Sequence, residues 1–262
     1  MSDTMEENKG VHPSFFRVIK EREDLKNKLA GIKKKIGVYS AKGGVGKTTV
    51  AVNLAYTLKN MGYSVGLLDA DIDCPNVTMF TGISEKMDTS SLPLKPIIKD
   101  GIKIASTAMI VDDTKKPIIW RGPLIAKMVS DFLENTDWGD LDYLVIDLPP
   151  GTSDAPLSIM QLLDLTGFVL VTNPSRIASV NSIRSGMMAK RLNVAVLGVV
   201  ENMSEGAESK NTEELVKAVD APLLGRIPYL SKFRELSDSG SIPVNEDPEI
   251  GKAFAEIAKK LE

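Results

Sequence analysis

The sequence of 262 residues has few of the side chains that build metal sites and disulfides. It contains one cysteine, Cys74, and one histidine, His12. A single cysteine excludes a disulfide within the chain and a metal site made of several thiolates from one copy. Such cysteine usage is typical of a reducing compartment, so we expect a cytoplasmic protein. His12 lies in a polar N-terminal segment and is assigned no role.

Long apolar runs are also missing. No stretch approaches the roughly 20 apolar residues that a membrane-spanning helix needs, and residues 1–9 lack the apolar centre of a signal peptide. The net charge is −3, from 32 basic and 35 acidic residues, so the chain as a whole does not attract nucleic acid or an anionic membrane. We therefore expect a soluble protein without integral membrane association and without a nucleic-acid partner.

The chain does have enough apolar residues for one large domain, since 43% of its residues are hydrophobic. From residue 36 onward, strand-like apolar runs alternate with amphipathic stretches. That alternation predicts an α/β fold of three layers, a mainly parallel twisted sheet flanked by helices. The proline-containing stretch 84–99 is the predicted mobile loop. The predicted strands cover residues 36–40, 64–69, 102–106, 143–147, 168–172, 194–200 and 223–227.

Residues 1–35 are predicted to be an N-terminal extension, followed by a single domain over residues 36–262. The segment from Arg17 to Lys35 carries eight basic and three acidic side chains. Spacings of four and three residues along it predict a partly helical segment that lies on the domain with a solvated basic face. The residues of this stripe are Val18, Arg22, Leu25, Leu29 and Ile32.

The most specific pattern is a glycine-rich turn between the first predicted strand and a helical pattern that begins at Val50. A strand, such a turn and a helix N-terminus direct backbone N–H groups and a positive dipole end at one point, which predicts a phosphate-binding loop and a P-loop NTPase fold. We predict that Lys47 reaches the β- and γ-phosphates of ATP and that Thr48 offers its hydroxyl to Mg²⁺. The predicted nucleotide-binding residues of the loop are Gly43, Gly44, Val45, Gly46, Lys47, Thr48 and Thr49.

Carboxylates follow two of the predicted strands. One strand runs into Asp69-Ala70-Asp71, and another ends at Asp147 before Pro149-Pro150-Gly151. Because ligands bind beyond the carboxyl ends of parallel strands, we predict that Asp147 holds Mg²⁺, Asp71 orients the attacking water and the Gly151 N–H senses the γ-phosphate. The predicted activity is hydrolysis of ATP to ADP and phosphate. The alternative for each aspartate is a cap of the turn or helix after its strand.

The loop with its leading lysine resembles the deviant phosphate loop of the MinD/ParA class of ATPases, and further segments resemble the Mrp (ApbC) branch of that class. This resemblance implies that Lys42 contacts the nucleotide of a partner subunit, and that Asn202 and Pro228 lie beside the adenine. It also implies a homodimer through the nucleotide face, an unidentified client protein and a role in iron–sulfur cluster assembly. The segments are Ile119–Pro123, Asp137–Tyr143, Val145–Thr152, Val200–Ser204 and Leu224–Pro228.

A physical reason for the intermolecular role of Lys42 stands beside the resemblance. Lys42 precedes the loop glycines, so its side chain need not point into its own pocket. A cation supplied across an interface acts like an arginine finger, which is worth about 10³ to 10⁵ in rate. We therefore expect slow hydrolysis that depends on dimerisation or on a partner.

The sequence departs from the Mrp pattern at one place. Mrp-type proteins generally carry Cys-x-x-Cys soon after the Asn-Met-Ser segment, where this chain has Glu205–Ser209. Cys74 gives one thiol per subunit and two per dimer, whereas an ordinary iron–sulfur cluster takes four cysteine ligands. The chain alone therefore does not predict a bound cluster, and a packing role for Cys74 is the ordinary alternative.

Two other functions stay open. One is a nucleotide-switched positioning ATPase like MinD or ParA, which would bind a membrane or DNA, and the other is a regulatory scaffold that binds ATP but barely hydrolyses it. The basic segment Arg17–Lys35 leaves weak binding to DNA or anionic lipid open. Residues 248–262 carry an apolar stripe with three acids and three lysines, which favours packing on the domain over membrane binding. The stripe consists of Ile250, Phe254, Ile257, Ala258 and Leu261.

Overall fold

The structure is a computed structural model, and it describes residues 23, 25–110, 122–152, 156, 159–160, 162–206 and 208–262. Side chains are described for these residues except 122–126 and 234. His12, residues 17–22 and 24 of the predicted N-terminal helix and residues 119–121 of the Ile119–Pro123 segment therefore lie outside the described residues.

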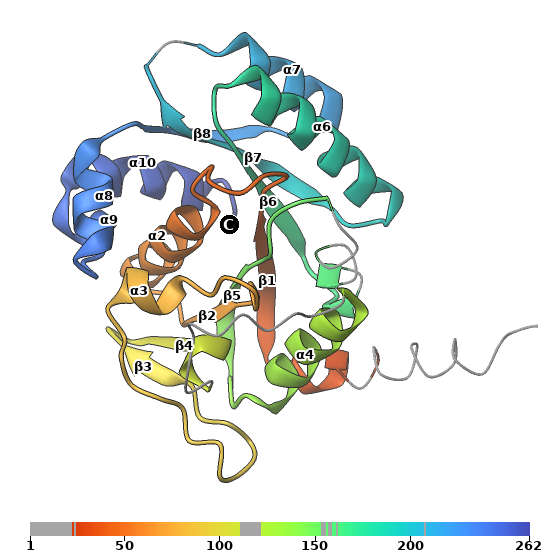
Figure 1. The fold of residues 1–262 in the computed structure, drawn as a ribbon, viewed down its shortest axis with the longest axis vertical. Helices are drawn as coiled ribbons and strands as arrows, with labels where there is room; N and C mark the ends of the chain where they lie inside the picture. Colours follow the sequence, from red (N-terminus) through yellow and green to blue (C-terminus); the bar gives the residue numbers. More distant parts are fainter. Residues whose placement is uncertain are drawn as a thin grey trace, which may run out of the picture.

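A sheet of eight strands forms the centre of the molecule, in the order β3-β4-β2-β5-β1-β6-β7-β8 (Figure 1). All neighbouring strands are parallel except β3, which runs antiparallel to β4 at the edge. The parallel strands place their carboxyl ends at one edge of the sheet. The strands are β1 Ile32–Tyr39, β2 Val65–Asp69, β3 Ile97–Lys99, β4 Ile102–Ser106, β5 Leu141–Asp147, β6 Gly167–Thr172, β7 Val196–Ser204 and β8 Leu223–Pro228.

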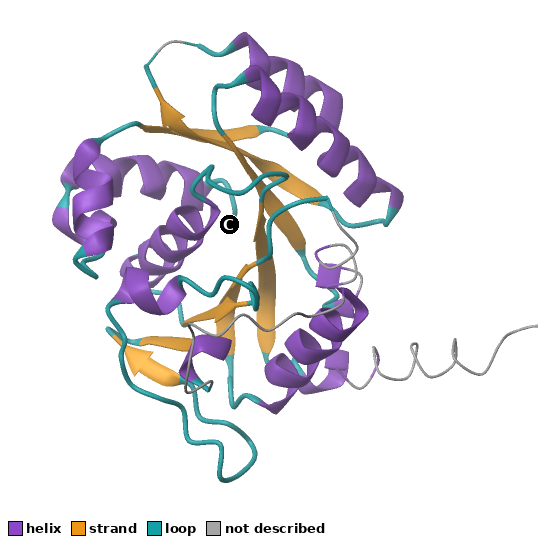
Figure 2. Ribbon diagram, in the orientation of Figure 1, coloured by secondary structure: helices purple, strands orange, loops and turns teal. Residues whose placement is uncertain are grey.

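Helices cover both faces of the sheet, which confirms the predicted three-layer α/β fold (Figures 1 and 2). The helices α2, α8, α9 and α10 lie on one side, and α4, α6 and α7 lie on the other (Figure 1). Central strands such as β2 are buried along their whole length, as expected between two helical layers. The helices are α2 Lys47–Asn60, α3 Val77–Thr81, α4 Gly122–Asn135, α6 Arg176–Arg191, α7 Lys210–Val219, α8 Ser231–Asp238, α9 Pro243–Glu246 and α10 Pro248–Lys259, with a 3₁₀ turn η1 at Thr107–Met109.

The N-terminal part of the fold corrects one prediction. Strand β1 begins at Ile32, so the helical pattern does not extend to Lys35 as expected. Three consecutive lysines, residues 33–35, gave no apolar strand pattern in the sequence. In the fold, the charges of the first two have partners on the neighbouring strand β5. Lys33 pairs with Asp142 at 2.7 Å, and the Lys34 ammonium lies 5.4 Å from the centre of the Tyr143 ring. Residues 25–28 are helical, and Leu25 and Leu29 are buried in the core.

Three other boundaries differ from the sequence prediction. The strand β3 lies within the predicted loop 84–99, because its three residues pair with β4. Helix α2 begins at Lys47, three residues earlier than predicted, and β7 continues to Ser204 instead of ending at Val200. The C-terminal prediction is confirmed, since α10 buries Ile250, Phe254, Ile257 and Ala258 completely against the domain.

Candidate functional site

The glycine-rich loop joins β1 to α2 at the carboxyl edge of the sheet. Gly44 and Gly46 have φ angles of +81° and +85°, a region that favours glycine. Gly46 also has no room for a side chain, because a Cβ there would meet the Asn202 amide nitrogen at 2.1 Å. No side chain caps the N-terminus of α2, so the N–H groups of its first turn are left for an anion.

Lys47 and Thr48 meet the strand-end aspartates. The Lys47 ammonium lies 2.6 Å from Asp147 Oδ1 and 3.7 Å from Asp71 Oδ2, and the Thr48 hydroxyl donates to Asp147 Oδ2 at 2.6 Å. Lys47 is only 6% exposed and Asp147 is completely buried. Burial alone lowers the pKa of Lys47, but the carboxylates of Asp147 and Asp71 outweigh it and raise that pKa. The lysine is therefore a fixed cation at the end of β5.

Asp71 lies in the turn after β2 and is 6% exposed. Burial raises its pKa to about 6, against the opposing influence of Lys47. Its carboxylate accepts a hydrogen bond from the Cys74 N–H at 3.3 Å. Asp71 thus sits opposite the loop lysine, as the sequence predicted for a residue at the phosphates.

Asp69 is a structural support that the sequence analysis did not assign. It is completely buried and is the register partner of Asp147 on the neighbouring strand. Its carboxylate accepts hydrogen bonds from the N–H groups of Asp71 and Val77 and from the Ser106 hydroxyl. Burial and the Asp147 charge raise its pKa to about 7. An aspartate closing a fully apolar strand was the only sequence sign of this anchor.

Lys42 lies differently from Lys47, although both belong to one loop. Its side chain is exposed and does not line the cavity that forms beside the loop, whereas Gly43, Gly44 and Lys47 do. The Ser40 hydroxyl donates to its carbonyl and fixes the backbone there. Its ammonium is thus held outside its own pocket.

Gly151, whose N–H was predicted to sense the γ-phosphate, makes its hydrogen bonds within the protein in this structure. Its φ angle is +103°, its N–H donates to the Ser40 carbonyl at 3.0 Å, and its carbonyl accepts from the Tyr39 hydroxyl. Among the described residues that line the cavity at the loop, Pro150 stands in its place. In this arrangement the Gly151 N–H is engaged within the protein and would have to change partner to contact a phosphate.

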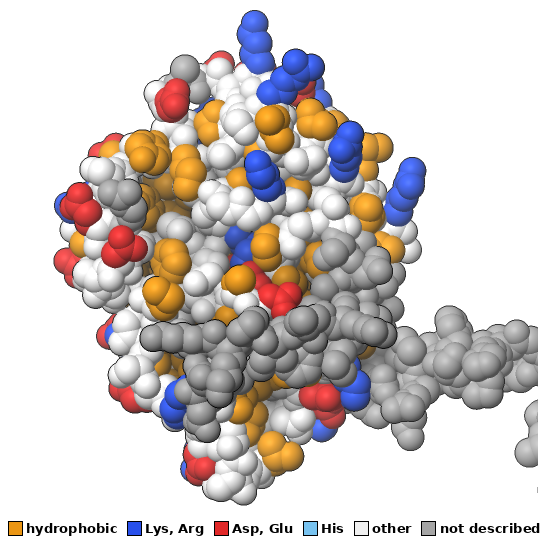
Figure 3. All heavy atoms as spheres, viewed as in Figure 1, with side chains coloured by type: hydrophobic (Ala, Val, Ile, Leu, Met, Phe, Trp, Pro, Cys, Tyr) orange, Lys and Arg blue, Asp and Glu red, His pale blue; other side chains and the backbone are white. Residues whose placement is uncertain are grey.

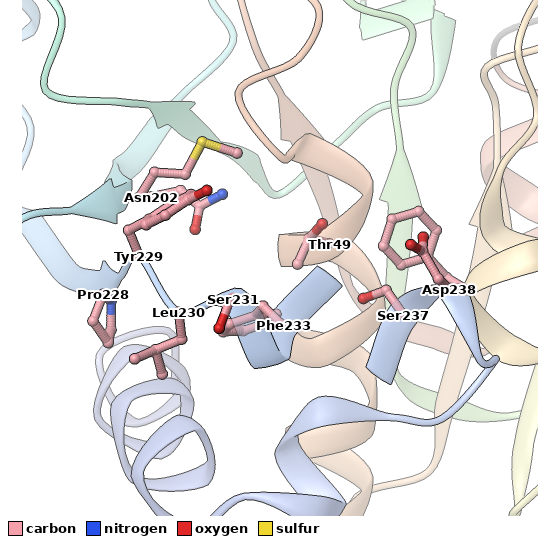
Figure 4. Close-up of a pocket in the computed structure, with 11 residues that line it drawn as sticks. Thr49, Asn202, Pro228, Tyr229, Leu230, Ser231, Phe233, Ser237 and Asp238 are labelled. Atoms are coloured by element: carbon pink, nitrogen blue, oxygen red, sulfur yellow. The ribbon is translucent and has the colours of Figure 1, made fainter. Parts of the chain in front are cut away.

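Two cavities of about 330 Å³ each adjoin the loop and share Thr49 and Phe80. The first holds the loop glycines, Lys47, Thr48, Asp71 and the exposed Cys74. The second holds both residues expected beside the adenine, Asn202 and Pro228 (Figure 4). Asn202 also donates to the carbonyl of Val45 at 2.9 Å and so ties β7 to the loop.

The second cavity has an apolar lining that the sequence analysis missed. Tyr229, Leu230 and Phe233 lie around Asn202 and Pro228 (Figure 4). Met203 of β7 and Phe80 of α3 also line the cavity. These side chains come from α3, β7, the β8–α8 connection and α8, which are adjacent only in the folded chain. Thr49, Ser231, Ser237 and Asp238 also line this cavity, and a largely apolar pocket with a few polar groups is the usual form of a small-molecule site.

Membrane-spanning helices and clusters of metal ligands are both absent from the described residues. No described helix is long and apolar enough to cross a membrane. Among the same residues, no group of three or more histidine, cysteine, aspartate or glutamate side chains could hold a metal ion.

Comparisons with known proteins agree with this geometry. A family model described as the NUBPL iron-transfer P-loop NTPase, of the ParA group, matches residues 31–262. The chain belongs to this family. Like other P-loop NTPases, a NUBPL-type NTPase binds a nucleotide with Mg²⁺, which fits the loop and the strand-end aspartates.

Similar sequences occur in archaea and eukaryotes. An iron–sulfur cluster carrier protein of Methanocaldococcus jannaschii is 38% identical, over 97% of this chain and 93% of its own length. The iron–sulfur cluster transfer protein NUBPL of Dictyostelium discoideum is 41% identical, over 89% of this chain and 77% of its own length. The resemblance to Mrp-type proteins is therefore confirmed for this NUBPL-type chain.

Solved structures show the same fold. A nucleotide-binding protein from Archaeoglobus fulgidus in complex with ADP has a TM-score of 0.72 and 35% identity, over 89% of this chain and 96% of its own. The septum site-determining protein MinD of Pyrococcus horikoshii, complexed with Mg-ADP, has a TM-score of 0.68 and 25% identity, over 87% of this chain and 96% of its own. The NUBPL-type chain thus has the predicted P-loop NTPase fold.

Proposed function

We propose that this chain is a homodimeric ATPase that hydrolyses ATP slowly in the service of iron–sulfur cluster transfer. The arrangement of Lys47, Asp71 and Asp147 around the loop is the observation that carries the proposal. Phosphoryl transfer depends on positioning and on charge neutralisation, and these three groups supply both at one edge of the sheet. The names of the relatives supply the link to cluster transfer.

The residues at the end of β5 suit a magnesium ion. Thr48 and Asp147 present hydroxyl and carboxylate oxygens 2.6 Å apart, and oxygen donors are the ligands that Mg²⁺ prefers. When bound with ATP, the ion would supply positive charge that offsets the charge of the phosphates. Lys47, now paired with Asp147, would exchange part of that contact for the β- and γ-phosphates.

Asp71 is proposed to orient the attacking water. Its carboxylate faces Lys47 and lines the phosphate cavity, so a water held by it would stand beside the terminal phosphate. The base of the nucleotide would occupy the second cavity, with Asn202 and Pro228 at its edge.

Lys42 is proposed to complete the site of a second copy across the nucleotide face. Its exposure, and its place outside the lining of its own cavity, leave its ammonium free to reach across an interface. Hydrolysis would then require the dimer.

The proposal also includes the division of the chain into an N-terminal extension and one ATPase domain. The first strand of that domain starts at Ile32. Limited proteolysis should cut the chain N-terminal to Leu25 and leave the domain whole.

The iron–sulfur cluster is best regarded as cargo. Cys74 is exposed at the phosphate cavity and would give a dimer two thiolates, while a cluster takes four ligands. The other ligands would have to come from a partner protein. Cluster transfer by this chain is thus proposed to be a shared event between the dimer and its client.

Turnover and assembly test the ATPase part of the proposal. Wild-type protein should release phosphate from ATP and shift from monomer to dimer when ATP and Mg²⁺ are added, as measured by light scattering. Asp71→Asn should keep ATP binding and lose turnover. Binding without turnover in the wild type would favour the regulatory scaffold instead.

Anaerobic reconstitution with iron and sulfide tests the cargo. Because the dimer supplies two thiolates, the reconstitution includes a small thiol such as glutathione to stand in for the ligands of the partner. Iron content and absorption spectra should then show a cluster on the wild-type dimer, with less iron on Cys74→Ser. If the wild type binds no iron with or without ATP, the chain would be an ATP-driven accessory factor and not a carrier.

A further inference from the structure

Helix α6 has its hydrophobic face turned outward. Its buried residues are all small, whereas Ile177, Val180 and Met187 are 67%, 41% and 49% exposed. An ordinary surface helix of a globular protein does the opposite and buries its large apolar side chains. The buried residues are Ala178, Ser179, Ser182, Ser185, Gly186 and Ala189.

Close packing explains why the inner face is small. A Cβ at Gly186 would meet Val219 of α7 at 2.5 Å, and the Ser182 hydroxyl reaches Thr172 of β6. Ile183 packs partly against the core, but the rest of the inner face of α6 is small where it meets α7 and the sheet. The packing of α6 therefore does not use Ile177, Val180 and Met187, which are left for another surface.

The exposed residues form one continuous stripe, here called the α6 stripe. With 3.6 residues per turn, positions 177, 180, 184, 187 and 191 lie within about a quarter of the circumference and extend over about 21 Å. Arg184 and Arg191 are exposed between and beyond the apolar side chains, and neither pairs with another described residue. Figure 3 shows hydrophobic and basic side chains together over α6. The stripe consists of Ile177, Val180, Arg184, Met187 and Arg191.

The charge of α6 argues against a second copy of this chain as the occupant. The helix contains four basic residues and no acidic residue. Two copies related by a two-fold axis would bring like charges together, which costs free energy. The stripe also leads away from the proposed dimer face, since α6 starts at the carboxyl end of β6 and returns toward the amino end of β7.

We propose that the α6 stripe docks an acidic, amphipathic helical segment of the client protein. Apolar residues of that segment would cover Ile177, Val180 and Met187, and its carboxylates would pair with Arg184 and Arg191. Methionine side chains adapt to different partners, which suits a carrier with more than one client. The identity of the partner as a client rests on the proposed function, whereas the chemistry of the surface does not.

Site-specific crosslinking in the full chain tests the docking. A photoreactive benzoylphenylalanine replaces Val180, and a matched protein carries it at Lys217, an exposed lysine of α7 outside the stripe. After irradiation in an extract of the source cells, the crosslinked peptides are sequenced. We expect the Val180 position, and not Lys217, to capture a segment with net negative charge and helically spaced apolar residues.

A synthetic copy of the captured segment then gives the affinity. Arg184→Glu with Arg191→Glu should weaken its binding about 10-fold or more, and Lys217→Glu should leave it unchanged. Capture of a non-acidic segment, capture of another copy of this chain, or no capture beyond the Lys217 level would overturn the proposal. Binding of the wild type to phosphatidylserine vesicles, if the double variant Arg184→Glu with Arg191→Glu abolished it, would also overturn the proposal. The stripe would then be a membrane-binding surface.

ATP turnover of the same variants separates this inference from the proposed function. The α6 variants should hydrolyse ATP like the wild type, because their side chains lie outside both cavities. Loss of peptide binding with normal turnover supports docking at α6. If the wild type bound the peptide but neither bound nor hydrolysed ATP, docking at the α6 stripe would be supported and the proposed ATPase activity would be refuted.

Discussion

The carboxyl edge of the sheet and the outer face of α6 both reverse the usual distribution of side chains, in opposite senses. At the edge, charged groups are buried, with Asp69 and Asp147 completely inaccessible. On α6, large apolar groups are exposed, with Ile177 at 67%. The buried charges have partners within the chain, and the exposed apolar groups have none among the described residues. The network of Lys47 and the buried aspartates indicates a site for a small ligand. The uncovered apolar surface of α6 indicates a site that another protein would cover.

The largest expected effect is that of replacing Lys42, the loop lysine that makes no contact with the buried aspartates. Lys42→Ala should lower ATP turnover by about 10³-fold or more, the range known for cations supplied in trans. Its free energy of unfolding should stay within about 0.5 kcal/mol of the wild type, because the side chain is exposed. Phosphate release and urea unfolding measure the two quantities. Normal turnover with normal dimerisation would remove Lys42 from the site.

Lys47 should behave in the opposite way in the nucleotide-free protein. Lys47→Met removes the cation between Asp71 and Asp147 and leaves buried carboxylates unpaired, so we expect a loss of about 3 to 5 kcal/mol in the free energy of unfolding. Lys42→Met is the matched control from the same loop. Equal stability of the two variants would show that the buried network does not depend on its lysine.

The pH dependence of stability reports the cost of burying Asp71. Burial raises its pKa in the folded protein from 3.8 to about 6, so its contribution to stability is complete below about pH 4 and is lost as the pH rises to 6. Asp71→Asn should remove this dependence and stabilise the nucleotide-free protein at pH 7 by up to about 3 kcal/mol. Unfolding curves at pH 4 and pH 7 measure it. An unchanged slope for Asp71→Asn would assign the dependence to other groups.

The smallest effects compare the two faces of α6. Gly186→Ala should cost about 1 to 3 kcal/mol, because the new methyl group would meet Val219. Val180→Ser and Met187→Ser should change stability by no more than about 0.5 kcal/mol, because both side chains are exposed. Thermal unfolding of the three variants is sufficient. A large loss on the outer face would mean that the α6 stripe is covered within the protein.

Much of the nucleotide site followed from the sequence because its parts are local. The glycine turn and the carboxylates each directly follow a strand, and parallel strands bring their carboxyl ends to one edge. The positions of Lys47, Thr48, Asp71 and Asp147 needed no further information. The sequence did not indicate that the Gly151 N–H donates a hydrogen bond to the Ser40 carbonyl.

Other features could not be read from the chain. The anchoring of the β2 turn by Asp69 depends on Ser106 and Val77, and the apolar lining of the second cavity comes from α3, β7, the β8–α8 connection and α8. Strand β1 was predicted too short because the three lysines at its start carry no apolar pattern. The contacts of Asp69 and of the second cavity join residues that are far apart in the sequence, so no local pattern predicts them.

The sequence by itself determined that this protein binds a nucleotide at the end of a parallel sheet, because spacing along the chain fixes which groups meet at a strand end. Only the tertiary structure decided that Lys47 is buried beside Asp71 and Asp147 and that Lys42 is exposed. It alone also decided that α6 exposes its large residues, because a helix shows its period in the sequence but the side that neighbours cover depends on the space between them.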